Sequence, residues 1–367
     1  MLGFMRRKVL QIVGPCWVNK GDRLMVEALQ QRLSGAYYLP MPAGLNTPAS
    51  KFWGPSNIGQ MLGQAACRLA QVLAHGKPEV ILDCSGYQFG DPWAALAKVQ
   101  SLRLLMYQLF SGAGGKIVML PQSLGPFRDR RVASVAAGIL HLADLIFVRE
   151  SVSRQHALDL GCPPARIRIA PDYSILVPPQ VPDCPDEWAH RVCVVPSQRM
   201  IDKTPPEAGS TYVAALQRCF DWIWDQGLEP CILVHDTEDR PLARSLQESA
   251  TRPLKVFDPP PRKAKGILGA CRAVVGSRYH ALVGALSLGT PAIGTGWSHK
   301  YRGLFQDYSC EECLIDRFDS DADLVERLRL VVEKSSRDRL VEKLLAEARN
   351  HRARTLSMFA ELQNLLA

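Results

Sequence analysis

The chain has 367 residues and a formal net charge of +8 at neutral pH; 47% of its residues are hydrophobic and 22% are charged. This composition is that of a globular protein and excludes a disordered chain, while the length suits two domains. No apolar run approaches the roughly 20 residues that a transmembrane helix needs. The positive charge favours an anionic partner, whether a phosphorylated substrate, a membrane surface or nucleic acid, and does not choose among them.

The first expected element is a buried strand in VLQIVG, near the start of the chain. Basic residues precede it, as in a signal peptide, but Gln11, Gly14 and Pro15 interrupt the apolar run, and no small-x-small cleavage site follows. We therefore expect a cytoplasmic protein. The positive charge leaves peripheral contact with the inner face of a membrane open.

The 11 cysteines are odd in number and stand mostly inside apolar runs, which predicts reduced thiols rather than a disulfide framework. Cys310 and Cys313 form a lone CxxC, and a structural zinc would need two more ligands at a matching spacing. We expect neither a metal nor a cofactor.

Short apolar runs alternate with helix-like segments along the whole chain. The runs are VLQIVG, EVILDCSG, KIVMLPQS, DLIFVRES, RIRIAPD, RVCVVPS, PCILVHD, LKVFDPP, RAVVGSR, TPAIGTG and CLIDR. Helices are expected between them, over residues 22–32, 132–142, 152–160 and 212–226. Most runs are continuous rather than alternating, as in parallel strands covered by helices on both faces. The pattern predicts an α/β fold of two doubly wound, Rossmann-like domains facing a central cleft.

Proline and polar residues cluster in VPPQVPDCPDEW, which predicts a linker. The expected division is an N-terminal domain over residues 1–176, a linker over 177–190 and a C-terminal domain over 191–320. Residues 321–367 are amphipathic and charged, which predicts terminal helices.

Polar side chains follow the first strand in NKGDRLMVEAL. Gly21, in the same turn as Asn19, would allow its backbone to come close to another group. Asp22 is expected either to cap the following helix or to bind a substrate. Because ligands of open α/β sheets bind beyond the carboxyl ends of the strands, this turn is a candidate site.

Later strands of the first half also end in polar residues. These residues are Asp91, Gln122, Ser123, Arg149 and Asp172. Arg149 is expected to face either the cleft or a neighbouring carboxylate. None of the loops contains a dinucleotide, P-loop, nucleophile-elbow or HExxH motif.

The segment VVGSRYHALVGALSLGTPAIGTGWSHK places a strand, a turn and a helix in succession. Ser277 is expected to cap a helix that starts near His280 and ends at Gly289. A helix N-terminus attracts anions, and Arg278 adds a planar fork suited to phosphate or carboxylate. His280 can change protonation near neutral pH and so act in proton transfer. Structural pairing of Arg278 stays an alternative.

The same segment resembles the C-terminal signature of the polysaccharide pyruvyltransferase family, in which Gly-x-Arg-x-His is followed by a small-residue helix, Gly-x-Pro and a lysine. NKGDRLMVEAL resembles the family's Asn-x-Gly-Asp turn, and LPQSLGPF, FVRES and APDYSIL resemble its middle motifs, in the family's order. The resemblance spans roughly residues 10–305. One loop departs from the pattern, because the family's run of glycines is replaced by Cys84-Ser85-Gly86.

The resemblance implies a GT-B-like enzyme that uses phosphoenolpyruvate as donor. The product would be a pyruvate ketal on a sugar of a polysaccharide or of its lipid-linked precursor. His280 would protonate the donor or orient its leaving phosphate, and Asp22, Asp91 or Asp172 would act on the sugar hydroxyls. The implied binding residues are Arg278, Arg149, Lys300, Gly21, Asn19, Gln122, Ser123, Asp172 and Ser277. His235 and His299 are the reserve candidates for the acid.

Two other functions stay open. A GT-B glycosyltransferase with a nucleotide sugar would share the fold, but would usually offer a carboxylate for the donor ribose, and none follows His280 closely. A noncatalytic protein that binds anions or glycans is the other alternative. Nucleic acid is not an expected partner.

Overall fold

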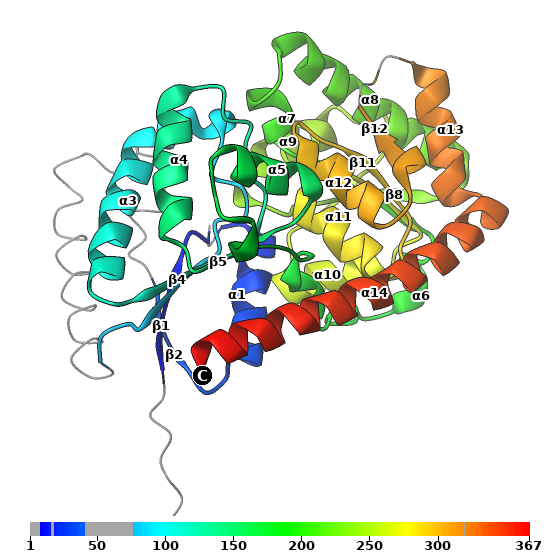
Figure 1. Ribbon diagram of the computed structural model, residues 1–367. Helices are drawn as coiled ribbons and strands as arrows, with labels where there is room; N and C mark the ends of the chain where they lie inside the picture. The colour runs from blue at the N-terminus through cyan, green and yellow to red at the C-terminus, as the bar shows by residue number, and fades with distance from the viewer. Residues whose placement is uncertain (1–7, 16–17, 41–75, 317, 319) are drawn as a thin grey trace, which may run out of the picture. The chain divides into compact units, whose positions relative to one another are not determined.

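The computed structural model describes residues 8–15, 18–40, 76–316, 318 and 320–367 (Figure 1). The basic start considered as a signal peptide, residues 1–7, lies outside them. The chain forms two compact units. We call them the N-terminal unit (residues 1–16, 25–173 and 356–367) and the C-terminal unit (residues 17–24 and 174–355).

The N-terminal unit is built on a six-stranded parallel sheet in the order β2-β1-β3-β4-β5-β6. The strands are β1 (Val9–Val13), β2 (Tyr37–Pro40), β3 (Val80–Asp83), β4 (Lys116–Gln122), β5 (Leu145–Val148) and β6 (Ile167–Ile169). Strands β1, β3 and β5 are buried along their whole length, which explains their continuous apolar sequences. The strand order reverses between β1 and β3, the usual place for a ligand.

Helices connect these strands. They are α1 (Lys20–Arg32), α3 (Ala97–Gly112), α4 (Arg130–Leu142) and α5 (Ser151–Asp159), with 3₁₀ turns η4 (Asp91–Leu96), η5 (Pro164–Arg166) and η6 (Tyr173–Leu176). Helices α3 and α4 lie side by side (Figure 1). Tyr107 of α3, Ile139 of α4 and Ile146 of β5 belong to one hydrophobic core.

The C-terminal unit contains a second six-stranded parallel sheet in the order β12-β11-β10-β7-β8-β9. Its strands are β7 (Arg191–Val195), β8 (Glu229–Leu233), β9 (Lys255–Phe257), β10 (Ala273–Gly276), β11 (Ala292–Thr295) and β12 (Leu314–Ile315). In chain order this is the Rossmann arrangement 3-2-1-4-5-6, and the order reverses between β7 and β10.

The remaining helices follow from Pro185 onward. They are α6 (Pro185–Trp188), α7 (Arg199–Asp202), α8 (Pro206–Asp225), α9 (Arg240–Glu248), α10 (Pro261–Ala270), α11 (Tyr279–Leu286), α12 (His299–Asp307), α13 (Asp321–Val332) and α14 (Lys334–Leu366), with η7 (Thr237–Asp239) and η8 (Glu311–Cys313). The predicted α/β class, with two doubly wound GT-B-like domains and C-terminal helices, is confirmed. Every apolar run predicted as a strand forms one; β2 was not predicted. No helix in the described part of the chain combines the length and apolarity needed to span a membrane.

The predicted linker, residues 177–190, begins as a segment docked on α10. The Lys265 ammonium group donates to three backbone carbonyl oxygens, those of Ser174, Ile175 and Val177, at 2.9, 3.1 and 2.7 Å. At the next position, a Cβ atom on Gly266 would come within 1.8 Å of the Gln180 carbonyl oxygen. The start of this segment therefore packs on α10, within the C-terminal unit, whose larger part begins at Ser174.

The nine described cysteines are all free, and all but Cys184 are buried. Burial raises the pKa of Cys310, and raises that of Cys313 to about 12. Thiols with such pKa values stay protonated and unreactive at neutral pH. Across the described ranges, no three or more His, Cys, Asp or Glu side chains are grouped so as to hold a metal ion.

Candidate active site

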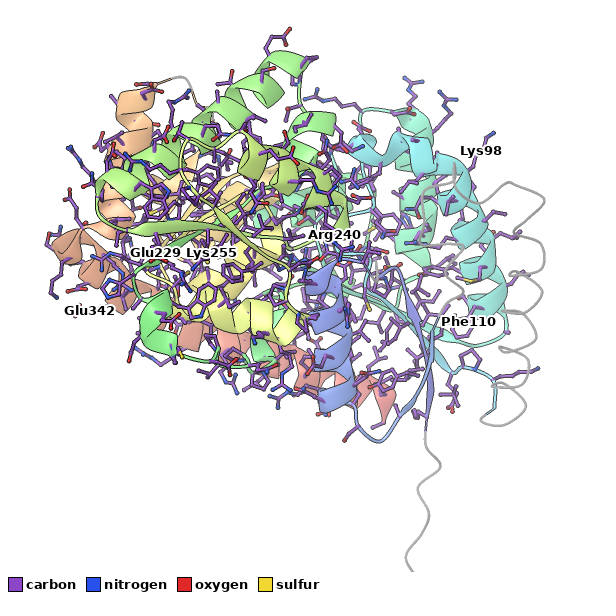
Figure 2. The ribbon with its side chains drawn as sticks, turned by 180° about the vertical axis from the view of Figure 1, so that it is seen from behind. Lys98, Phe110, Glu229, Arg240, Lys255 and Glu342 are labelled. Atoms are coloured by element: carbon purple, nitrogen blue, oxygen red, sulfur yellow. The ribbon has the colours of Figure 1, made fainter. Side chains whose placement is uncertain are left out.

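The residues that the sequence analysis singled out at both ends of the chain meet at the carboxyl edge of the second sheet. Figure 2 labels Glu229 and Lys255, which begin β8 and β9, and Arg240, which lies beyond the other end of β8. The candidate residues lie at the Arg240 end. Residues 17–24 belong to this C-terminal unit.

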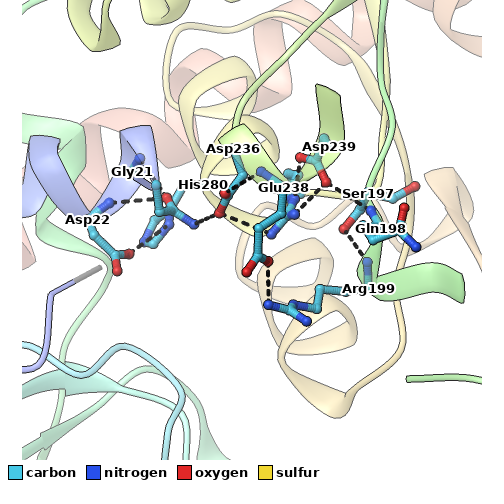
Figure 3. Close-up of polar contacts among 12 residues, drawn as sticks. Gly21, Asp22, Ser197, Gln198, Arg199, Asp236, Glu238, Asp239 and His280 are labelled. Carbon is cyan, nitrogen blue, oxygen red and sulfur yellow. Dashed lines mark hydrogen bonds and ion pairs between the residues drawn. The ribbon is translucent and has the colours of Figure 1, made fainter. Parts of the chain in front are cut away.

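Asn19 caps α1 and ties it to the loop after β8; its partners Gly21, Asp22 and Asp236 are labelled in Figure 3. Its Oδ1 accepts the backbone N–H groups of Gly21 at 2.8 Å and Asp22 at 3.3 Å, while its Nδ2 donates to Asp236 Oδ2 at 3.2 Å. The backbone N–H of Lys20 donates to the carbonyl oxygen of His235 at 3.3 Å. Asn19 therefore caps α1 in place of Asp22, and the Asp22 carboxylate contacts a different residue.

Lys20 is a buried residue of this site that the sequence analysis missed. Its ammonium group donates to the Val234 carbonyl oxygen at 2.7 Å and to Asp258 Oδ1 at 2.6 Å. These bonds fasten the first turn of α1 to the ends of β8 and β9. The available signal was its position between Asn19 and Gly21, inside a loop already identified as a candidate.

Gly21 and Asp22 both contact His280, the histidine of the C-terminal motif. A Cβ atom on Gly21 would lie 2.0–2.2 Å from the Cγ, Cβ and Nδ1 atoms of His280, closer than any side chain can approach. Asp22 Oδ1 lies 3.6 Å from His280 Nδ1, and both side chains are largely buried. The glycine therefore makes room for the imidazole, and the adjacent carboxylate pairs with it.

The Ser277–His280 segment follows β10, beside the point where the strand order reverses. The backbone N–H of Ser277 donates to the Val195 carbonyl oxygen at 3.0 Å, at the end of β7. Helix α11 begins at Tyr279 with Arg278 as its N-cap, and no described side chain caps it. The expectation that Ser277 caps this helix is wrong, because Ser277 lies one residue too early. The helix ends at Leu286, before the predicted Gly289.

Arg278 is paired with buried carboxylates. Its Nε donates to Asp239 Oδ2 at 2.7 Å, its Nη2 bonds Asp239 Oδ1, and its Nη1 lies 3.4 Å from Asp236 Oδ2. Burial alone would lower the pKa of Arg278, but Asp239 and Asp236 outweigh it, so the pKa is raised and the group stays cationic. Arg278 is thus structurally paired, the alternative that the sequence analysis left open. Two carboxylates offset its charge.

Lys300, in the first turn of α12, lies among aromatic rings. Its ammonium group is 5.1 Å from the ring centroid of Tyr279, 5.2 Å from that of Trp297 and 5.5 Å from that of Tyr301. Cation–π attraction acts within about 6 Å of a ring centroid, so these rings stabilise the ammonium charge. Because Tyr279 begins α11, this charge lies beside the start of that helix.

The other predicted site residues lie in the N-terminal unit. Arg149 Nη2 is 2.5 Å from Asp172 Oδ2, and Arg149 Nη1 donates to the Gly86 carbonyl oxygen at 3.2 Å. Arg149 therefore faces a neighbouring carboxylate, one of its two expected environments. Both side chains are buried at the carboxyl edge of the first sheet.

Asp91, Ser123 and Gln122 have different surroundings. The Asp91 oxygens accept the backbone N–H groups of Arg128 at 2.8 Å and Asp129 at 3.1 Å, which accounts for this residue without a substrate. Ser123 Oγ donates to Glu150 Oε2 at 3.0 Å. Gln122 is fully buried, and neither polar atom of its carboxamide has a hydrogen-bond partner within the described part of the chain.

The loop that departs from the family pattern rests on a buried polar network. Ser85 Oγ donates to Asp83 and accepts from Arg103 Nη1 at 2.6 Å, while the Tyr107 hydroxyl donates to Asp83 Oδ2 at 2.6 Å. Burial, together with Asp83, raises the pKa of Tyr107 far above its usual value, so the hydroxyl remains a donor. A serine in place of glycine therefore links a buried aspartate to a buried arginine.

Comparison with known proteins agrees with this architecture. The family model described as polysaccharide pyruvyl transferase matches residues 19–299. The amylovoran biosynthesis protein AmsJ of Erwinia amylovora is 23% identical over 260 residues, and the alignment covers 65% of this chain and 61% of that protein. The chain thus aligns with less than two thirds of that relative.

Solved structures resemble the fold at low sequence identity. Anabaena HepE in complex with UDP-glucose has a TM-score of 0.58 at 10% identity, covering 98% of this chain and 99% of that one. UDP-GlcNAc 2-epimerase of Methanocaldococcus jannaschii, in complex with UDP-GlcNAc and UDP, has a TM-score of 0.53 at 11% identity, covering 90% and 94%. At such identities the likeness establishes the fold alone.

Proposed function

Because the chain belongs to the polysaccharide pyruvyl transferase family, we propose that it transfers a pyruvyl group from phosphoenolpyruvate to a sugar, forming a ketal. The observation that carries this proposal is the contact between Asp22 and His280, 3.6 Å apart. It joins the two matched motifs that are most distant in sequence and places a carboxylate–imidazole pair, the usual means of proton transfer, at a helix start.

In the proposed reaction, His280 gives a proton to the methylene carbon of the donor, which becomes the methyl group of the ketal. Two sugar hydroxyls then bond to the adjacent carbon, and the bond from that carbon to the phosphate oxygen breaks. Of the two hydroxyl protons, one restores His280 and the other leaves with phosphate. Asp22 holds Nδ1 of His280, which assigns proton delivery to Nε2.

The charge of the donor needs a cationic partner. We assign this role to Lys300 and to the start of α11, since both lie next to His280 in the fold. Arg278 acts by holding the loop from Asp236 to Asp239, because its fork is bonded to these carboxylates. This assignment replaces the direct donor contact expected from the sequence.

The acceptor is a sugar of a polysaccharide or of its lipid-linked precursor. We also propose a cytoplasmic location with peripheral contact at the inner face of a membrane, which the net charge of +8 supports.

The test is a thermal-shift comparison of phosphoenolpyruvate with UDP-, GDP- and CMP-sugars, followed by kinetics of His280→Gln. Phosphoenolpyruvate should stabilise the protein, and His280→Gln should retain donor binding while turnover falls by ~10²–10⁴-fold, the usual contribution of general acid catalysis. His190→Gln, at an exposed histidine of the same unit, is the matched control. A shift with nucleotide sugars alone would identify a glycosyltransferase, and His280→Gln with full turnover would exclude His280 as the acid.

A further inference from the structure

His235 is a buried histidine beside the proposed donor site that has no role in the mechanism above. It stands two residues after β8, at the carboxyl edge of the sheet, and only 2% of its surface is exposed. The carbonyl oxygens of Val234 and His235 both bind Lys20, so the first turn of α1 lies directly on this segment. The Nδ1 atom of His235 has no hydrogen-bond partner among the described residues.

The cationic groups around His235 already have carboxylate partners. Lys20 is paired with Asp258 at 2.6 Å, Arg278 with Asp239 and Asp236, and His280 with Asp22 at 3.6 Å. His235 differs because no carboxylate of the described ranges is paired with it. Burial lowers the pKa of His235 well below its usual value, and the charges of His280, Lys20 and Arg278 lower it further.

We propose that His235 is a second histidine of the donor site and that its imidazole takes up a proton from solvent when an anion binds beside it. The inference rests on the proposed function, because that function brings a phosphate and a carboxylate to this edge of the sheet. In the free protein the imidazole is neutral. An anion bound among these groups raises the pKa of His235, because it offsets the effects of burial and of the three neighbouring positive charges. It therefore favours the protonated imidazole.

The direction of the pH effect follows from this linkage. Binding raises the pKa of His235, so the complex holds more protons than the free protein between the two pKa values. Anion affinity should therefore rise as the pH falls through that range, by up to about tenfold per pH unit.

The test is isothermal titration calorimetry in buffers of different ionisation enthalpy, which counts the protons taken up on binding. Sulfate is the first probe, because it does not titrate near neutrality, whereas a phosphate group does so near pH 6. Phosphoenolpyruvate is the second. With wild-type protein, we expect net proton uptake on anion binding, approaching one proton per anion at a pH between the free and bound pKa values of His235.

The variants locate the proton. His235→Gln should abolish the uptake and flatten the pH dependence of sulfate affinity to less than about twofold per unit, whereas His280→Gln should retain the uptake. His351→Gln is the matched control, since His351 is equally buried in the same unit but its Nε2 bonds the Asp307 carbonyl oxygen. If His235→Gln does not fold, the imidazole resonances of wild-type protein with and without sulfate report the same protonation.

Each outcome decides the question. Anion binding without proton uptake overturns the inference and leaves the proposed function intact, as does uptake that persists in His235→Gln and disappears in His280→Gln. Sulfate binding with uptake at His235, while phosphoenolpyruvate fails to bind, overturns the proposed donor and supports the inference. If neither anion binds, both are wrong.

Discussion

The ion pair between Arg278 and Asp239 allows a quantitative test of the role assigned to Arg278. Asp239 is fully buried, and its Oδ1 also accepts the backbone N–H of Gln198 at 2.8 Å. Arg278→Met keeps most of the side-chain volume and leaves this carboxylate without a cation. Removing one partner of a buried pair destabilises proteins by about 3–5 kcal/mol, so we expect a loss in that range.

The double variant Arg278→Met/Asp239→Leu should be more stable than Arg278→Met. Replacing a buried pair by apolar groups of similar volume is often neutral, apart from ~1 kcal/mol for the Gln198 N–H that loses its acceptor. Urea unfolding followed by tryptophan fluorescence measures the cycle, since the described tryptophans of the C-terminal unit report on its unfolding. These are Trp188, Trp222, Trp224 and Trp297.

The pH dependence provides an internal check on this prediction. Burial raises the pKa of Asp239 even when Arg278 opposes the shift, and removal of the arginine raises it further. The folded variant then holds a proton that the unfolded chain releases, so its stability falls as the pH rises above the unfolded pKa near 4. The free energy of unfolding that Arg278→Met loses relative to wild type should be smaller at pH 5 than at pH 7. A loss below about 1 kcal/mol in Arg278→Met, or a strictly additive cycle, would refute the structural role.

Three further predictions concern other parts of the molecule. Gly21→Ala should lower turnover by at least ~10²-fold, because the new Cβ displaces the His280 ring, whereas Gly35→Ala, which has open space around it, should match wild type in the same assay. Lys265→Met should lower the free energy of unfolding by about 2–4 kcal/mol, since buried carbonyl oxygens lose their donor. The same variant should expose residues 174–183 to limited proteolysis. Unchanged cleavage would show that other contacts hold the segment. Thiol titration under denaturing, non-reducing conditions should find nearly all cysteines free, and several disulfides in protein from its native source would contradict the reduced state.

The strands could be predicted because a parallel sheet is covered on both faces. Each strand then appears as a continuous apolar run, and the runs in β1, β3 and β7 are fully buried in the structure. Strand β2 was missed because YYLP stands at the sheet edge and ends in a proline, so no continuous apolar run marks it. Local pattern therefore determines whether a buried strand is recognised.

Side-chain partners were harder to predict because they depend on contacts between distant segments. The sequence placed Arg278 at a strand end, but its partner Asp239 lies 39 residues earlier, in a 3₁₀ turn that no apolar pattern marks. Likewise, Gly21 was identified as a position of close approach, but the neighbour that requires it, His280, is supplied by the other end of the chain. Motif residues could be identified, whereas the atoms they contact could not.

The assignment of residues 17–24 to the C-terminal unit has a consequence for biosynthesis. Asn19 leaves the ribosome long before Asp236, its partner 217 residues later, a delay of roughly 10–40 s at 5–20 residues per second. The N-terminal unit also waits, because its residues 356–367 include Glu361, which pairs with Arg168 at 3.0 Å. Neither unit can finish folding until the last helix has emerged. A fragment cut between residues 173 and 174 would therefore lack part of its own unit on either side, so neither fragment is expected to fold completely by itself.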